Sequence, residues 1–199
     1  MVVGLTGGIG SGKTTIATLF DRFDNVVIYN ADFEAKKIMN SSSIIKSQII
    51  QQFGEKSYLN NQLNRSYLAS LVFNNKNNLK TLTSLVHPEV KKHFQQFVNL
   101  HSKKEYILYE NAILFESKNN LNCDTIISVF TPLYIRIKRT MLRDNCSREE
   151  VEFRMKNQYL EEKKHLQSNY VIYNFTKEMV QNQVLRIHNI LTKKADIFS

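Results

Sequence analysis

Residues 7–14 read GGIGSGKT and fit the pattern G-x-x-x-x-G-K-[ST]. In this pattern, glycines let the backbone turn tightly, so that N–H groups and a helix N-terminus point at one place and favour a polyphosphate. The lysine reaches the β- and γ-phosphates of a nucleotide, and the hydroxyl after it binds the Mg²⁺ ion that bridges them. We therefore predict a phosphate-binding loop. Its predicted contacts are Gly8, Gly10, Ser11, Gly12, Lys13, Thr14 and Thr15, with Thr14 as the ligand of Mg²⁺.

A phosphate-binding loop connects a strand to a helix, and the segments on either side of this loop have the patterns of these two elements. Residues 2–6 are mostly apolar and favour a strand, and residues 15–20 keep apolar side chains at a spacing that suits a helix. A strand, a glycine-rich loop and a helix in this order favour the phosphate-binding interpretation over a flexible turn without a ligand.

Four further apolar runs predict the other strands of one sheet. They cover residues 25–29, 105–109, 124–130 and 169–173, and helical patterns separate them. We expect an α/β fold, with a five-stranded parallel sheet in a three-layer α/β/α arrangement. In such a sheet, ligands bind at the edge formed by the carboxyl ends of the strands.

Asp32 stands at this edge, because it follows the second predicted strand within Asn30-Ala31-Asp32. A carboxylate there is placed to orient or deprotonate an attacking hydroxyl group in a phosphoryl transfer. An Asp just before the helical pattern of residues 33–39 is also a common N-cap. Position alone leaves both interpretations open.

The stretch from residue 40 to about residue 97 has helical patterns with polar turns, and no strand is predicted there. An insertion of helices between the second and third strands is a natural place for a substrate-binding subdomain. Arg65 and the pair His87-Pro88 stand out within it. The simpler interpretation of Arg65 is a surface cation, and that of His87-Pro88 is the start of a helix.

Polar residues also follow the third and fifth strands. Glu116 is either a site carboxylate or a solvated side chain. Asn174 comes directly after the fifth strand at the ligand-binding edge, where it is placed to read a base.

A helix with three arginines follows the fourth strand. Thr131 as the N-cap and Pro132 at the first helical position predict where it begins. Arg136, Arg139 and Arg143 are spaced by three and four residues, so they share one face of the helix. That face is either a clamp for transferring phosphate or an ordinary solvated surface.

The next helix is marked by a capping pattern. Ser147 and Glu150 have the spacing of a capping box. Two basic helices joined in this way resemble a lid.

The length and composition suit one folded domain. The chain has 199 residues, of which 42% are hydrophobic. No run approaches the roughly 18 apolar residues of a membrane span, and the N-terminus leads into a strand instead of a signal peptide, so a cytoplasmic protein without membrane contact is expected. Cys123 and Cys146 have no His or Cys at metal-ligand spacing and are expected to be free thiols.

The formal net charge of +9 fits either a nucleic-acid surface or a pocket for several phosphate groups. The positive residues are spread over helices, without a basic block that contains interleaved aromatic residues. This distribution favours phosphate-rich small molecules, and no nucleic-acid partner is expected.

Several segments together resemble the bacterial dephospho-coenzyme A kinase family over essentially the full chain. The opening LTGGIGSGK at residues 5–13 is more restrictive than a generic phosphate loop. The other matching segments are Asn30-Ala31-Asp32, residues 63–73, His87-Pro88 and KRTMLRD at residues 138–144.

The resemblance implies a single P-loop kinase domain over residues 1–199. Its core would comprise residues 1–32, 103–131 and 168–199, with a helical acceptor-binding subdomain at about 33–102 and a lid at about 132–167. The implied reaction is ATP-dependent phosphorylation of the ribose 3'-hydroxyl of dephospho-CoA, which gives CoA and ADP in the last step of coenzyme A synthesis.

The resemblance also implies roles for individual residues. Lys13, Asp32, Arg139 and Arg143 would be catalytic, with Asp32 facing the 3'-hydroxyl and the two arginines closing over the phosphates. Arg65 and His87 would lie near the acceptor, Asn174 would bind ATP with the loop, and the cofactor would be Mg²⁺. ATP and dephospho-CoA are the expected partners of a monomer or weak homo-oligomer.

The chain departs from the family pattern at three places. Asn30 replaces the first acid of Asp-Ala-Asp, Ala112 replaces a proline before Leu114-Phe115-Glu116, and Tyr170 replaces an acid, while Asn174 still matches.

Two other functions fit the phosphate loop. One is another small-acceptor P-loop kinase, such as a nucleoside or nucleotide kinase, and the other is a nucleotide-dependent ATPase that binds nucleic acid.

Overall fold

The computed structural model describes residues 1–73 and 75–198. It divides into two compact units, which we call the sheet unit (residues 1–30 and 101–199) and the helical unit (residues 31–100). Among the described residues, no helix has the length and apolar character needed to cross a lipid bilayer.

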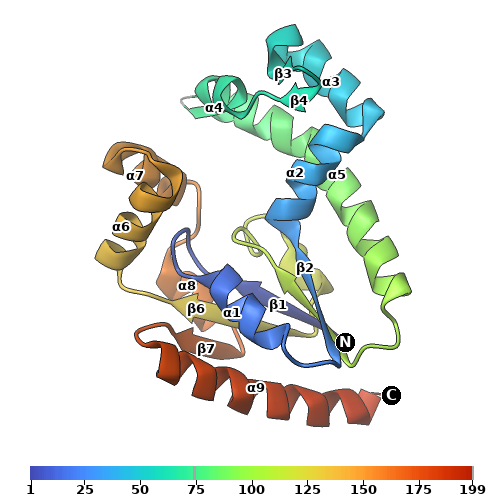
Figure 1. The fold of residues 1–199 in the computed structure, drawn as a ribbon, viewed down its shortest axis with the longest axis vertical. Helices are drawn as coiled ribbons and strands as arrows, with labels where there is room; N and C mark the ends of the chain where they lie inside the picture. The colour runs from blue at the N-terminus through green and yellow to red at the C-terminus, as the bar shows by residue number, and fades with distance from the viewer. Residues whose placement is uncertain (74, 199) are drawn as a thin grey trace. The chain divides into compact units, whose positions relative to one another are not determined.

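The sheet unit is built on five parallel strands in the order β2-β5-β1-β6-β7 (Figure 1). The predicted five-stranded parallel sheet is confirmed, and the strand ends differ from the predicted ends by at most one residue. The strands are β1 (Val2–Thr6), β2 (Val26–Asn30), β5 (Tyr106–Glu110), β6 (Thr125–Phe130) and β7 (Tyr170–Tyr173).

Helices lie on both faces of this sheet. On one face, α1 (Lys13–Phe20) and α9 (Lys177–Phe198) pack against alternate apolar residues of the strands, because successive side chains of a strand point to opposite faces. On the other face, α8 (Glu161–Leu166) packs against β6. The main core comprises Val3, Leu5, Ile16, Phe20, Val26, Leu108, Ile127, Val129, Ile172, Val184 and Leu191, among others.

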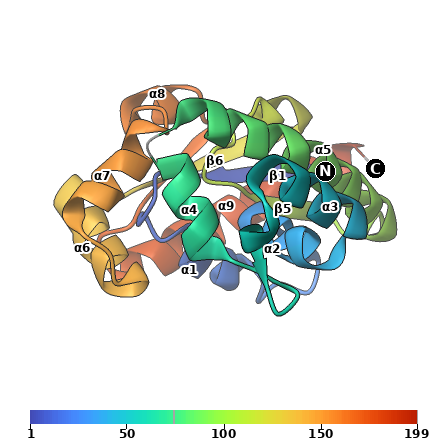
Figure 2. The same cartoon turned by 90° about the horizontal axis from the view of Figure 1, so that it is seen from above.

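An arm of helices leads from β6 to α8. Its first two helices, α6 (Leu133–Asp144) and α7 (Arg148–Lys156), lie side by side (Figure 1 and Figure 2). The predicted capping box at the start of α7 is confirmed, since Ser147 Oγ accepts from Glu150 N and Ser147 N donates to Glu150 Oε2. A short 3₁₀ helix, η2 (Asn119–Asn122), precedes β6.

The helical unit contains a small strand pair that sequence patterns did not predict. Strands β3 (Tyr58–Leu59) and β4 (Gln62–Leu63) form an antiparallel hairpin. Asn60 and Asn61 have φ values of 48° and 63°, and two consecutive residues with positive φ match the twist of a two-residue hairpin turn. The helices of this unit are α2 (Ala31–Ser41), α3 (Ser43–Phe53), η1 (Glu55–Ser57), α4 (Arg65–Phe73) and α5 (Lys76–Leu100).

The helix-start interpretation of His87-Pro88 is wrong. Pro88 lies inside α5, which runs for 25 residues. A proline in a helix interior removes one backbone hydrogen bond, so the neighbouring turns of α5 must maintain the helix there. These turns are fixed by packing, because Val86, Val90 and Phe94 are buried.

Candidate active site

The phosphate loop connects β1 to α1, as predicted. Gly12 is the N-cap of α1 and has a left-handed backbone with φ 89°. A side chain at this position would be strained, and its Cβ would lie 2.4 Å from the Asn174 Nδ2 atom. The first turn of α1 then presents Lys13, Thr14 and Thr15 immediately after the loop.

Lys13 folds back over the loop. Its Nζ atom donates to Gly7 O at 2.9 Å and to Gly8 O at 3.2 Å, and the residue is only 8% exposed. These bonds keep a buried ammonium group satisfied and place its positive charge at the loop.

Thr14 is joined to a carboxylate from a neighbouring strand. Its hydroxyl donates to Glu110 Oε1 at 2.6 Å, and Asn30 Nδ2 donates to Glu110 Oε2 at 2.7 Å. The three side chains come from α1, β5 and β2, whose ends meet at the edge of the parallel sheet. Glu110 is 5% exposed and is therefore a buried carboxylate with two side-chain donors.

Glu110 is not among the residues predicted from the sequence. Its position in the sequence could have indicated a functional role. Glu110 is an acid at the end of a strand that is otherwise apolar or aromatic, and this strand end lies at the edge of the sheet where ligands bind. Hydroxyl and carboxylate oxygens are the ligand types that Mg²⁺ takes, usually with one or two carboxylates and the phosphates of the substrate. The Thr14 and Glu110 side chains thus fit the ion.

Two side chains from strand ends hold the loop at Ser11. Thr131 Oγ1 donates to Ser11 O at 2.9 Å, and Asn174 Nδ2 donates to the same oxygen at 2.8 Å. The prediction that Thr131 caps α6 is wrong, because Pro132 occupies the N-cap position and the Thr131 hydroxyl is engaged with the loop. The Asn174 amide nitrogen is likewise engaged with the loop, and contact of this residue with a base stays a prediction.

The three arginines of α6 do not form one solvated cationic face. Arg136 is 5% exposed, donates from Nε to Ile9 O at 3.0 Å and pairs with Glu161 at 3.3 Å. Burial lowers the pKa of its guanidinium, and the charge of Glu161 acts against that shift. Arg136 therefore supports the loop from within the fold.

The other two arginines are exposed. Arg139 Nη1 lies 3.7 Å from the place that a Cβ on Gly12 would take, so its guanidinium is beside the loop. Arg143 forms a two-bond pair with Asp144, at 2.8 and 3.1 Å, and Asp144 also accepts from Arg154. The bond from Arg143 is the main cause of a lowered pKa of the Asp144 carboxyl.

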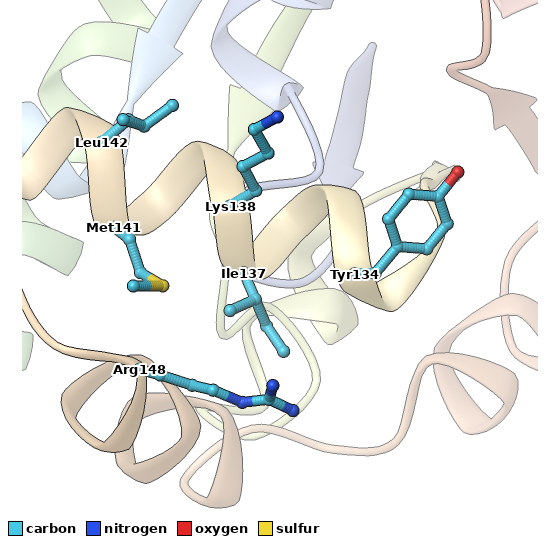
Figure 3. A pocket seen from close by; sticks show the side chains of 6 residues that line it. All are labelled: Tyr134, Ile137, Lys138, Met141, Leu142 and Arg148. Atoms are coloured by element: carbon cyan, nitrogen blue, oxygen red, sulfur yellow. The ribbon is translucent and has the colours of Figure 1, made fainter.

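A pocket of about 380 Å³ lies between α6 and α7 (Figure 3). Ile137 and Met141 point from α6 toward Arg148 of α7, and the rest of the lining is Tyr134, Lys138 and Leu142. None of the lining residues is a predicted site residue.

Glu116 is neither a solvated side chain nor an unpaired carboxylate. Its Oε1 atom lies 2.9 Å from Nζ of Lys164, which is fully buried, and it also accepts from Tyr159 N at 2.7 Å. The side chain thus joins the segment after β5 to α8.

The remaining predicted residues belong to the helical unit. Asp32 is exposed in the first turn of α2, which begins at Ala31, so the N-cap interpretation of Asp32 is wrong. Arg65 is exposed at the start of α4 and lines a pocket of about 490 Å³. His87 is exposed on α5. Contacts of these residues with substrate stay predictions.

Comparison with known proteins agrees with the fold and the loop. A family model described as dephospho-CoA kinase matches residues 1–179. A dephospho-CoA kinase of Bacteroides fragilis is 32% identical over 192 residues, which cover 96% of this chain and 93% of that protein.

Solved structures share the fold of this chain. The crystal structure of TT1252 from Thermus thermophilus has a TM-score of 0.82 and 27% identity, covering 96% of each chain. Dephospho-CoA kinase from Campylobacter jejuni shares the fold, with a TM-score of 0.64 at 24% identity over 96% of this chain and 97% of that one. Because the family model spans most of the chain and the Bacteroides protein is similar over nearly its full length, the chain belongs to the dephospho-CoA kinase family.

Proposed function

We propose that the protein transfers the γ-phosphate of ATP to the ribose 3'-hydroxyl of dephospho-CoA and so makes CoA and ADP, the last step of coenzyme A synthesis. The observation that carries this proposal is the hydrogen bond from Thr14 of the phosphate loop to the buried Glu110 carboxylate. This bond joins the phosphate loop, where the nucleotide would bind, to a buried acid. The family to which the chain belongs is also named for this reaction.

The nucleotide would bind over the loop. The polyphosphate accepts hydrogen bonds from the backbone N–H groups between Gly8 and Thr15, and Lys13 turns from the Gly7 and Gly8 carbonyls to the β- and γ-phosphates. Asn174 completes the predicted ATP site from the end of β7. Loop residues that are already hydrogen-bonded need little rearrangement to receive the phosphates.

Thr14 and Glu110 would hold Mg²⁺ through their side-chain oxygens. The ion would supply positive charge that offsets the negative charge of the phosphates. Asn30 orients the Glu110 carboxylate from its other side by donating to Oε2. In this chain, the amide of Asn30 therefore takes a supporting role where the family pattern has an acid.

The acceptor would react by in-line attack on the γ-phosphate. Asp32 orients the 3'-hydroxyl and accepts its proton, while Arg139 and Arg143 neutralise the charge of the transferred group. Arg65 and His87 contact the acceptor within a binding subdomain at about 33–102. Closure of the lid, at about 132–167, excludes water that would otherwise compete as an acceptor.

The direct test is turnover of purified full-length protein with ATP, Mg²⁺ and dephospho-CoA, with CoA and ADP measured separately. Nucleosides, nucleotides and a single-stranded polynucleotide serve as alternative partners in parallel reactions. We expect CoA to form in a 1:1 ratio with ADP, and no stimulation by the polynucleotide. Faster phosphorylation of a nucleoside or nucleotide, or ADP without CoA, contradicts the proposal.

A further inference from the structure

The two peptide groups that flank Ile9 in the phosphate loop are each held by a side chain of the arm. Ile9 N donates to Gln158 Oε1 at 3.0 Å, and Ile9 O accepts from Arg136 Nε at 3.0 Å. The N–H belongs to the peptide that joins Gly8 to Ile9, and the C=O belongs to the peptide that joins Ile9 to Gly10, so neither of these two peptides can rotate without breaking a bond. The direction of the neighbouring N–H groups, which form the phosphate cradle, thus depends on where Gln158 and Arg136 lie.

The loop and the arm fit closely at Gly8. A Cβ atom on this residue would overlap the guanidinium of Arg136 and the carboxylate of Glu161. Those two side chains form the ion pair described above, with side-chain exposures of 6% and 14%. A small displacement of Glu161 would therefore be transmitted to Arg136 and to the loop, because close-packed groups have no space to absorb it.

The segment that carries Gln158 and Glu161 has little support of its own. Helix α8 has only six residues, and its N-cap, Leu160, offers no side-chain hydrogen bond. Isolated helices of this length are unstable in water, so α8 depends on tertiary contacts for its position.

Those contacts are the packing on β6, a hydrogen bond of 2.9 Å between His165 Nδ1 and Ser128 Oγ, and the pair Glu116 and Lys164. Lys164 Nζ lies 2.9 Å from Glu116 Oε1 and donates to Ala112 O at 2.8 Å. The same Glu116 oxygen accepts from Tyr159 N, which is next to Gln158 in the chain. Glu116 thereby fixes both ends of residues 159–164, and Lys164 lies one helical turn after Glu161.

We infer that Glu116 and Lys164 are positioning residues for the phosphate loop, which they control through Gln158 and Glu161. Their side chains bond to one another, to Ala112 O and to Tyr159 N. Their ion pair fixes residues 159–164, which sets the positions of Gln158 and Glu161, and these two residues in turn hold the peptides on either side of Ile9, Glu161 through Arg136. The functional consequence rests on the proposed function, since the loop is the proposed ATP site.

The test measures the loop directly, without substrate. Hydrogen exchange of the Ile9 amide is compared by NMR between the wild type, Glu116→Gln and the control Glu152→Gln. Glu152 forms an exposed ion pair with Arg148 in α7, so the control removes a similar charge from the same arm. We expect the Ile9 amide to exchange about tenfold faster in Glu116→Gln, with β1 amides unchanged. Exchange equal to that of the control overturns the inference.

Steady-state kinetics give the second readout. In Glu116→Gln the KM for ATP should rise about tenfold, while the KM for dephospho-CoA stays near that of the control. An equal rise in both constants, or a loss of kcat alone, contradicts a role at the phosphate loop. If no variant or wild-type protein makes CoA, the proposed function fails, whereas the exchange result still decides this inference.

A variant that leaves the ion pair in place covers the case in which Glu116→Gln does not fold. Gln158→Met removes the acceptor of the Ile9 amide at nearly constant volume. Faster exchange at Ile9 together with a raised KM for ATP supports the inference. Wild-type values for both show that the contact does not position the loop and overturn it.

Discussion

The predicted phosphate-loop residues of the sheet unit and the predicted acceptor residues of the helical unit differ in their exposure. In the sheet unit, Lys13 is buried and bonded to the loop, and Thr14 is bonded to Glu110. In the helical unit, Asp32 and Arg65 are exposed. The difference shows that the proposed nucleotide side is held by contacts within the protein, while Asp32 and Arg65 on the proposed acceptor side are accessible to solvent. Rigid, preorganised groups lower the cost of binding and of charge stabilisation where the phosphates lie.

The strongest effect should come from the buried cation of the nucleotide side. Lys13→Met keeps the length of the side chain but removes its charge, and kcat/KM should fall by about 10³-fold, as expected for a group that stabilises charge in the transition state. Lys177→Met, at an exposed position of α9, serves as the control. Activity of Lys13→Met within tenfold of the wild type would remove Lys13 from the reaction.

On the acceptor side, Asp32→Asn should lower kcat by about 10²-fold, because an amide cannot accept the proton of the hydroxyl. The melting temperature should stay within 1 °C or so of the wild type, since the side chain is exposed. Asp24→Asn, another exposed acid, is the matched control. A fall in stability equal to the fall in activity would mean that Asp32 has a structural role.

Asn30→Asp tests the charge arrangement around Glu110. It replaces a donor 2.7 Å from Glu110 Oε2 by a second carboxylate, so the free energy of unfolding should fall by about 1–3 kcal/mol without Mg²⁺. Added Mg²⁺ should recover part of this loss in thermal melts, because two carboxylates attract the ion more strongly than one. Asn182→Asp adds the same charge at an exposed site of α9. If both variants lost the same stability and responded equally to Mg²⁺, the charge arrangement inferred around Glu110 would be wrong.

The smallest effect concerns the core behind the loop. Burial lowers the pKa of His188, which bonds to the Tyr106 hydroxyl at 2.8 Å and stacks on Phe23. Its folded-state pKa lies below the unfolded value of about 6.5, so the unfolded state binds more protons and the free energy of unfolding falls as pH drops below about 6.5.

The contribution of His188 to this slope is at most about 1.4 kcal/mol per pH unit. Denaturant titrations between pH 5 and 8 should show a shallower slope for His188→Phe than for the wild type. His101→Phe, at a partly exposed position in a turn, is the control. An unchanged slope in His188→Phe would show that another group titrates.

Sequence patterns were sufficient where the cause is local. The loop of residues 7–14 and the five strands follow from residue type and periodicity, and so does the capping box at Ser147. The hairpin turn at Asn60 and Asn61 was missed because strands of two residues are too short for a periodic pattern.

Contacts between distant segments could not be predicted in this way. Glu110 meets Thr14 across 96 residues, and Gln158 meets Ile9 across 149. Spacing placed Arg136 on the same face as Arg139, but burial separates them, because only Arg136 lies against Ile9 and Glu161. Tertiary packing decides such differences, and periodicity contains no information about it.

Because Arg136 and Gln158 both hold Ile9, the chain between them begins and ends at the same residue of the phosphate loop. Its outer turn, between α6 and α7, contains Cys146. A dye attached to this thiol would lie outside the phosphate loop, on a segment that bonds to the loop through both Arg136 and Gln158. The turn is thus a suitable site for a fluorescent label that would report occupancy of the proposed ATP site without altering the phosphate loop.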